Sequence, residues 1–228
     1  MLPSQSPAAD CEGNIYMRNA CMLTETMEPA LAVRANGGTN LVSVSEIVPH
    51  SPSDIYLPAD QVDAIVVHPR NEQAASIPQR RHWPMLTEGA GVDVADALER
   101  VRYLNHFLRI TPQRGPVEDA LARLAASVFV GQTSPGAMVN IGVGLPEEVG
   151  RLLFVSGLYR DVTFTTETGV FGGVPTPGIF FGSAVNPTRF MSSVQMFRHY
   201  YGNLSIAVLG LLEADEHGNV NVSRRGPR

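Results

Sequence analysis

A single carboxylate, Glu167, stands between an apolar, strand-like run and a segment rich in glycine and proline. In the stretch FTTETGVFGGVPTPG (164–178) it is followed by Gly169, Gly172 and Gly173. Glycines let backbone or a ligand approach without side-chain collisions, and open α/β sheets bind ligands at the carboxyl ends of their strands. A glutamate at a strand end is more often solvated or ion-paired. Here the glycines that follow Glu167 favour a catalytic role for it.

A second glycine turn, NIGVGLP (140–146), leads from a strand into a helix. Backbone N–H groups at such a turn have no helical partner and suit an anion or a polarised oxygen. The pattern is not a dinucleotide fingerprint, because Glu147 stands where the third glycine would be. Glu147 and Glu148 in the first helical turn would repel a phosphate and favour a neutral polarised group. A plain strand–helix turn begun by Pro146 is the alternative.

Together the two motifs suit acyl chemistry, in which a carboxylate attacks a carbonyl and backbone donors hold the developing oxyanion. Other chemistries lack their residues. The sequence contains no G-x-S-x-G elbow and no phosphate-binding P-loop. Its six histidines never stand at H-x-H or H-x-x-x-H spacing, so no metal site is expected.

Composition excludes several classes of protein. The 228 residues are 44% hydrophobic and carry a formal net charge of −5, which is typical of a globular domain and unlike a nucleic-acid binder. The longest apolar run, LSIAVLGLL (204–212), is shorter than the roughly 20 residues that a bilayer requires. The N-terminus lacks the pattern of a secretory signal. Cys11 and Cys21 are expected to be free thiols, and we expect a cytoplasmic protein.

Short strands alternate with helices along the chain, which predicts an α/β fold with largely parallel pairing. Pro29 suits the first helix only if that helix begins later than Thr24. Residues 69–92 lose periodicity and predict a loop or linker. The expected helices are 24–38, 93–110, one running from Val117 through Val128, one opening at Pro146, and 187–203; the expected strands are 40–48, 62–69, 137–141, 161–167 and 204–215.

Helical spacing also predicts which side chains are buried. The expected buried faces are Val117, Ala120, Leu121, Leu124 and Val128 in one helix, and Phe190, Val194, Phe197 and Tyr201 in 187–203. The strand 204–215 is expected to be long and buried.

A repeated D-x-x-G-N motif, at 10–14 and 215–219, predicts two similar turns, only the second of which should follow a strand.

The segments NIGVGLP, TETGVFGGVPTPGIFFGSAVNP and AVLGLLEADEHGNVNVSRRG, in this order, resemble the β-like half of the family I coenzyme A transferases, above all the acetate/propionate and 3-oxoacid type. The segments DCEGNIYM, ANGGTNLVSVSEIVP and VDAIVVHP resemble the end of the α-like half. The resemblance implies an α/β fold of two Rossmann-like open-sheet halves, both incomplete. The α-like part would occupy residues 1–85, a linker 86–116, and the β-like part 117–228.

The resemblance also implies a mechanism. In this family the glutamate of an E-x-G motif attacks an acyl-CoA thioester, giving an acyl-glutamyl anhydride, and the released thiolate then forms a glutamyl–CoA thioester. By motif position that glutamate is Glu167. The residues beside the thioester would be Gly142, Gly144, Leu145 and Pro146, while Gly169, Gly172 and Gly173 would make room for the pantetheine arm.

The implied substrates are a short-chain acyl-CoA and a carboxylic acid, as in ketone-body or short-chain fatty-acid metabolism, with no permanently bound cofactor. The leading hypothesis is therefore a CoA-transferase that is weak or inactive as this chain alone. A homo-oligomer or a complementary CoA-transferase segment would complete it, and no nucleic acid or membrane partner is expected. The alternatives are an inactive CoA-transferase-like protein with an interaction role and a nucleotide-binding module at GVGLP.

Overall fold

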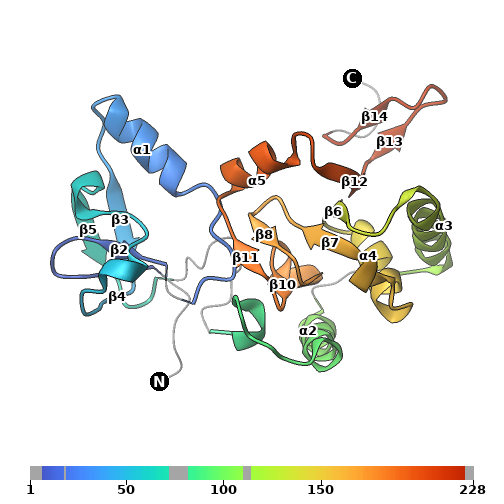
Figure 1. The fold of residues 1–228 in the computed structure, drawn as a ribbon, viewed down its shortest axis with the longest axis horizontal. Coiled ribbons are helices and arrows are strands. Elements are labelled where there is room, and N and C mark those ends of the chain that lie inside the picture. The colour runs from blue at the N-terminus through green and yellow to red at the C-terminus, as the bar shows by residue number, and fades with distance from the viewer. Residues whose placement is uncertain (1–6, 18, 72–81, 110–113, 224–228) are drawn as a thin grey trace.

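The computed structural model describes residues 7–17, 19–71, 82–109 and 114–223, apart from the side chain of Ile179. Its elements form open sheets flanked by helices (Figure 1), which confirms the predicted α/β class. None of the described helices is long and apolar enough to span a membrane.

The helices are α1 (Met27–Ala35), α2 (Val94–Phe107), α3 (Pro116–Gln132), α4 (Pro146–Val155) and α5 (Ser193–Tyr200). The strands are β1 (Ala8–Ala9), β2 (Ile15–Tyr16), β3 (Leu41–Val44), β4 (Glu46–Ile47), β5 (Ala64–Val67), β6 (Ala137–Ile141), β7 (Val162–Thr165), β8 (Val170–Phe171), β9 (Val174–Pro175), β10 (Ala184–Val185), β11 (Arg189–Phe190), β12 (Leu204–Val208), β13 (Glu213–Ala214) and β14 (Val220–Asn221).

The largest sheet has the strand order β11-β8-β7-β6-β12. Its centre is parallel, since β6 pairs in parallel with both β7 and β12, while β8 and β11 are antiparallel. Alternate side chains of β6 and β7, including Val139 and Phe164, pack in the apolar cluster that α3 and α4 complete. Tyr200 of α5 reaches Thr165 on the opposite face. The carboxyl ends of β6 and β7 therefore lie between α4 and α5 (Figure 1).

The N-terminal part contains two small sheets and α1. Strand β1 pairs antiparallel with β2 and parallel with β4, and β3 pairs in parallel with β5. The predicted strand 40–48 is divided at Ser45, whose N–H bonds to the carbonyl of Pro7 at 2.9 Å. Helix α1 begins at Met27. Pro29 thus lies in the first turn, where a missing N–H costs nothing.

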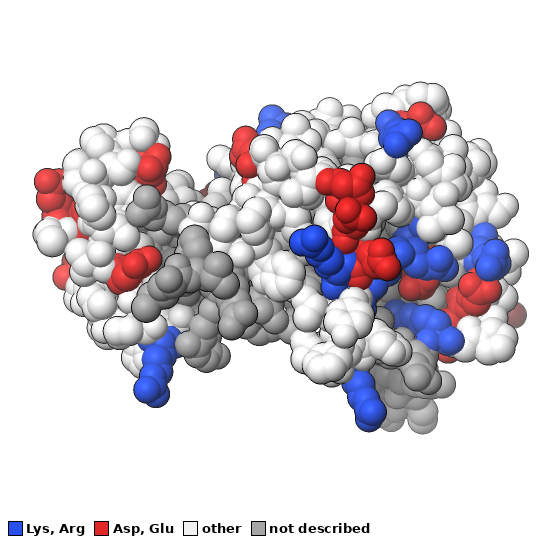
Figure 2. Space-filling model, turned by 90° about the horizontal axis from the view of Figure 1, so that it is seen from below, with Lys and Arg blue, Asp and Glu red and all other residues white. Residues whose placement is uncertain are grey.

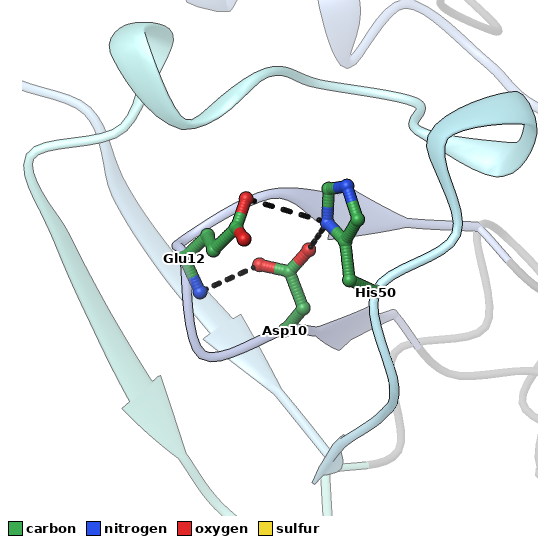
Figure 3. Close-up of side chains that lie close together, drawn as sticks. All are labelled: Asp10, Glu12 and His50. Atoms are coloured by element: carbon green, nitrogen blue, oxygen red, sulfur yellow. Dashed lines mark hydrogen bonds and ion pairs between the residues drawn. The ribbon is translucent and has the colours of Figure 1, made fainter.

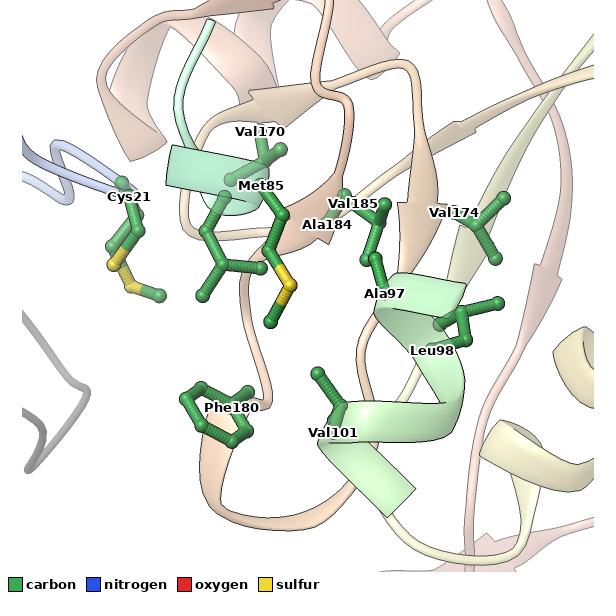
Figure 4. Packing of buried hydrophobic residues seen from close by; sticks show 12 residues of the cluster. Cys21, Met85, Ala97, Leu98, Val101, Val170, Val174, Phe180, Ala184 and Val185 are labelled. Atoms are coloured by element: carbon green, nitrogen blue, oxygen red, sulfur yellow. The ribbon is translucent and has the colours of Figure 1, made fainter. Parts of the chain in front are cut away.

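One apolar cluster joins segments that are distant in the sequence. Cys21, which precedes α1, is buried with Met85 and with Val101 of α2 (Figure 4). The same cluster contains Phe180 and the strand residues Val170, Val174, Ala184 and Val185. The range predicted to be a linker, 86–116, therefore contains a helix that packs into this core, and the proposed boundaries at 85 and 116 stay a prediction. Of the loop predicted over 69–92, residues 72–81 lie outside the described part.

The helix expected from Val117 is confirmed as α3, but the prediction of its buried face is wrong. Ala122 and Phe129 are buried, whereas Val117, Leu124 and Val128 are 67%, 64% and 66% exposed. Helix α3 contacts α4, and the side that it turns toward α4 and the sheet carries Ala122 and Phe129. The more regular apolar row faces outward.

The helix expected over 187–203 begins only at Ser193, because β11 occupies its predicted first turn. Ser192 caps the helix by accepting a hydrogen bond from the Gln195 N–H at 3.1 Å. The predicted face is again wrong: Met196 and Tyr200 are buried, while the neighbouring Phe197 and Tyr201 are exposed. The face that meets the sheet is therefore shifted by one residue.

The long buried strand expected over 204–215 is also wrong. Strand β12 ends at Val208 and forms an edge of the main sheet. Leu209, Leu211 and Leu212 beyond it are exposed, and β13 then pairs with β14 in a separate hairpin. An edge strand is covered on fewer sides than a central one, so apolar sequence alone did not guarantee burial.

The two D-x-x-G-N motifs form the same turn, as predicted. Each joins a pair of antiparallel strands, β1 to β2 and β13 to β14. The expectation that no strand precedes the first motif is wrong, because β1 precedes it. In each turn the aspartate Oδ1 accepts two backbone N–H groups at 2.9 Å, those of Glu12 and Asn14 for Asp10 and those of His217 and Asn219 for Asp215.

The first aspartate differs in its surroundings. The Oδ2 atom of the buried Asp10 also accepts hydrogen bonds from Tyr16 Oη at 2.6 Å and from Asn14 Nδ2 at 2.9 Å. His50 Nδ1 donates to the same oxygen at 2.7 Å (Figure 3). Asp10, Glu12 and His50 could together hold a metal ion. Both Asp10 oxygens are already used by the protein's own donors, however, so we assign this cluster a structural role. Burial opposes ionisation of Asp10, but its hydrogen bonds hold its pKa below the ordinary value.

The paired turns provide a matched test. Asp10→Ala should lower the melting temperature more than Asp215→Ala, because it leaves buried donors without an acceptor, whereas water can replace the exposed Asp215. Thermal unfolding of both variants, followed by circular dichroism at neutral pH, checks this. Equal decreases would contradict the structural role of the Asp10 cluster.

The effect of Asp10 should depend on pH. Its pKa is lowered from 3.8, so its stabilisation is present above that value and is lost as pH falls through the folded-state pKa. The hydrogen bond to Asp10 raises the pKa of His50 from 6.5, so that contribution is present below 6.5 and is lost as pH rises through the folded-state pKa. The difference in melting temperature between the wild type and Asp10→Ala should therefore be largest between pH 3.8 and pH 6.5.

Candidate active site

Glu167 lies in the tight turn that joins β7 to β8. The Gly169 N–H bonds to the Thr166 carbonyl at 3.1 Å, and the Thr166 N–H bonds to the Val170 carbonyl at 3.0 Å. Gly169 has a φ of +98°, a left-handed conformation that glycine adopts without strain. The spacing of Glu167 and Gly169 thus has a conformational cause, because the turn that presents the glutamate needs glycine two residues later.

Asn140, at the carboxyl end of β6, holds the Glu167 side chain. Its Nδ2 donates to Glu167 Oε1 at 3.0 Å. The parallel register places Asn140 opposite Thr165, two residues before Glu167. Asn140 is 5% exposed, and its Oδ1 is buried without a hydrogen-bond partner among the described residues. Sequence reasoning missed this residue, although a polar side chain in the apolar strand AMVNI was a signal that could have identified it.

Tyr200 of α5 lies on the same face of the sheet as Glu167. Its hydroxyl donates to Thr165 Oγ1 at 3.0 Å, and Thr165 in turn donates to the Val139 carbonyl at 2.9 Å. Burial raises the pKa of Tyr200 to about 12, and the charge of Glu167 adds to this shift. Tyr200 therefore stays protonated at neutral pH. It was missed because the neighbouring residues Phe197 and Tyr201 were expected to form the buried face.

The NIGVGLP turn brings its backbone close to the same strand ends. The Gly142 N–H donates to the Val208 carbonyl at 2.8 Å, and the Gly144 N–H donates to Glu147 Oε1 at 3.1 Å. Among the described residues, no backbone carbonyl accepts a hydrogen bond from the N–H of Val143 or Leu145. These two N–H groups are therefore candidate donors for a ligand. Pro146 begins α4, as expected of a strand–helix turn.

The glycines after Glu167 are packed against the protein's own chain. A Cβ at Gly169 would lie 1.8 Å from the Met191 carbonyl oxygen, and one at Gly173 would lie 2.3 Å from the Val185 oxygen. Gly172 is similarly confined by Thr188. The space beside these glycines is filled by backbone and side chains of 185–192. Gly144, with a φ of +89°, has no atom within 4 Å of its Cβ position and faces open space.

Comparisons with known proteins cover nearly the whole chain. The chain is 33% identical over 222 residues to the caffeate CoA-transferase of Acetobacterium woodii, and 27% identical over 227 residues to the acetate CoA-transferase YdiF of Escherichia coli K12. These alignments include 95% and 96% of this chain but 39% of each relative, so the chain spans about two fifths of their length. No family model matches.

The fold agrees with a solved structure. The acyl-CoA transferase YdiF from E. coli O157:H7, in a thioester complex with CoA, superposes with a TM-score of 0.72 at 25% identity. The superposition covers 96% of this chain and 37% of that one. The resemblance to CoA-transferases expected from the sequence is therefore confirmed.

The two kinds of glycine environment predict different effects of substitution. Gly144→Ala should cost about 1–2 kcal/mol, because only the left-handed backbone conformation opposes it. Gly169→Ala should destabilise the protein more, because its methyl group would also overlap the Met191 carbonyl. Urea unfolding of both variants measures the difference. A Gly169→Ala variant as stable as Gly144→Ala would contradict the close packing of this turn.

Proposed function

Because the chain is a homologue of CoA-transferases over nearly all of its length, we propose that it transfers coenzyme A between a short-chain acyl-CoA and a carboxylic acid, with Glu167 as the covalent nucleophile. The observation that carries this proposal is the hydrogen bond from Asn140 to Glu167 Oε1. It orients one carboxylate oxygen, while Oε2 has no hydrogen-bond partner among the described residues. A carboxylate held in this way has one oxygen ready to attack.

In the proposed reaction a Glu167 oxygen attacks the carbonyl carbon of the acyl-CoA. The carbon–sulfur bond breaks, CoA leaves as a thiolate, and an acyl-glutamyl anhydride remains. The thiolate then attacks the glutamyl carbonyl, so that the original acid departs as a carboxylate and a glutamyl–CoA thioester forms. The acceptor carboxylate reverses these two steps, which releases the new acyl-CoA and regenerates Glu167.

The neighbouring residues would support these steps in different ways. Asn140 orients Glu167, and its unpaired Oδ1 can accept a hydrogen bond from a donor on the substrate. The N–H groups of Val143 and Leu145 are candidates to hold the thioester oxygen as negative charge develops on it. In this assignment the turn supplies the oxyanion donors, while Gly142 and Gly144 supply its conformation and Pro146 starts the following helix.

We also propose that a complementary CoA-transferase segment, in the same or another chain, completes the site. Two observations support this. The outer edge of β12 is unpaired among the described strands, and apolar side chains on α3 and beyond β12 are exposed, among them Leu124 and Leu209. A covering segment would also help to exclude water, which weakens a carboxylate as a nucleophile. The same exposed surface favours the second candidate, an inactive CoA-transferase-like protein with an interaction role.

Covalent labelling separates these two candidates. Incubation with acetyl-CoA should increase the mass of the chain by one CoA less one water, and peptide mapping should place the adduct on Glu167. Glu167→Gln should abolish the adduct, because an amide is a poor nucleophile. An adduct on another residue would refute the assignment, and no adduct at all would favour the inactive candidate.

Asn140→Ala should slow adduct formation about 100-fold, because a nucleophile that loses its orientation pays a penalty of this order. Single-turnover labelling at saturating acetyl-CoA measures the rate. Asn40→Ala is the matched control, since it removes another buried asparagine, whose side-chain Nδ2 donates to the carbonyls of Ala30 and Gln61 in the N-terminal part. An Asn140→Ala variant that labels as fast as Asn40→Ala would contradict a positioning role.

A further inference from the structure

A well-enclosed cleft among the described residues does not include Glu167 in its lining. It has a volume of about 260 Å³ and lies between α2, α4 and the segment 174–182. Ile141 lines this cleft, and its side chain packs on the α4 face of the sheet. Asn140, the next residue along β6, points to the opposite face and holds Glu167. The cleft reaches the same strand ends from the α4 side, since Thr166, directly before Glu167, also lines it, but the Glu167 side chain is directed to the α5 side.

The walls of the cleft are largely apolar, but three arginines also line it. Its apolar wall includes Leu98, Phe154 and Val174. The arginines are Arg102 of α2, Arg151 of α4 and Arg114, which precedes α3. Figure 2, which views the molecule from the side of α2, shows basic and acidic side chains gathered over this part of the surface.

The positive charge of the cleft is only partly balanced. Arg151 Nε pairs with Glu148 at 2.5 Å. Burial raises the pKa of Glu147, and the nearby charge of Arg114 offsets part of this shift. The Nε atom of Arg114 is buried and has no hydrogen-bond partner among the described residues. Arg102 is half-buried and makes no hydrogen bond or ion pair within the described residues. Burial and the nearby charge of Arg151 both lower the pKa of Arg102, and the charge of Glu148 offsets part of this shift. An unpaired guanidinium beside a second one is stabilised when an anion binds.

We propose that this cleft binds an organic anion with an apolar body, whose anionic group pairs with Arg102 and whose body lies against Leu98 and Phe154. The anionic group can be a carboxylate or a phosphate, since a guanidinium pairs with either. The apolar wall favours a ligand larger than a bare inorganic ion. Glu167 is not among the residues that line the cleft, so binding there can be measured without the transferase reaction.

Titrations of the ¹⁵N-labelled chain with hexanoate, inorganic phosphate and CoA test the proposal. Hexanoate should shift the amide signals of cleft residues such as Gly142, Phe154 and Gly182, and should bind more tightly than inorganic phosphate. Tighter binding of CoA than of hexanoate would identify phosphate as the preferred anionic group, and the reverse would identify carboxylate. Phosphate that binds as tightly as hexanoate, or no shift with any probe, would overturn the proposal.

Variants locate the anionic group. Arg102→Gln should weaken hexanoate binding about tenfold or more, as expected for the loss of one charge-assisted pair, and Arg102→Lys should retain part of it. Arg114→Gln, a second variant, should weaken binding less, because Arg114 already lies near Glu147. Arg123→Gln, an exposed α3 residue paired with Asp119, is the control and should have no effect.

Two results would overturn the assignment while the protein remains folded. If hexanoate binds Arg102→Gln as tightly as the wild type, with the rest of the amide spectrum intact, the anion does not bind in this cleft. Loss of binding in Glu167→Gln would place the ligand at the other site. Unchanged binding in Glu167→Gln, together with loss in Arg102→Gln, would support the cleft even if Glu167 proved unable to carry CoA.

Discussion

The parallel register between β6 and β7 is the constraint on which the candidate site depends. It sets Asn140 opposite Thr165, so that the amide at the end of one strand meets the glutamate just beyond the end of the other. The register is maintained by Val139, Ile141 and Phe164, which are buried against the α3–α4 side. A shift of one residue would turn these apolar side chains toward the other face, and would also separate Asn140 from Glu167. The core and the site are therefore specified by the same pairing.

Successive side chains of β6 point to opposite faces of the sheet, so the two faces have different chemistry. On the α5 face, Asn140, Tyr200 and Glu167 form a polar group around one carboxylate. On the α4 face, Ile141 and Gly142 line an apolar cleft into which arginines project. The NIGVGLP turn belongs to both, since it leaves β6 at the strand end near Glu167 while Gly142 lines the cleft. A ligand in the cleft would therefore contact the turn that we propose to hold the thioester oxygen.

Sequence reasoning predicted the features that depend on local chemistry. The two glycine turns were predicted because turns and free backbone donors are encoded by a few adjacent residues, and the catalytic role of Glu167 stays a prediction. Asn140 and Tyr200 were missed because their importance arises only when β6, β7 and α5 pack together. The buried faces of α3 and α5 were predicted wrongly for a related reason: each helix offers more than one apolar row, and periodicity alone does not show which row meets the sheet. The glycines at 169, 172 and 173 were assigned to ligand access, whereas the structure shows the chain itself filling the space beside them.

The central claim is that Glu167 exchanges an oxygen with the carboxylate substrate during CoA transfer. The most direct measurement is to incubate the chain with acetyl-CoA and ¹⁸O-labelled acetate, and then to weigh the peptide that contains Glu167. If labelled acetate attacks a glutamyl–CoA thioester, the returning carboxylate keeps one oxygen of the acid. The account therefore predicts that ¹⁸O accumulates in the Glu167 side chain and is absent from Glu167→Gln. A Glu167 peptide that stays unlabelled, or label in another residue, would contradict it.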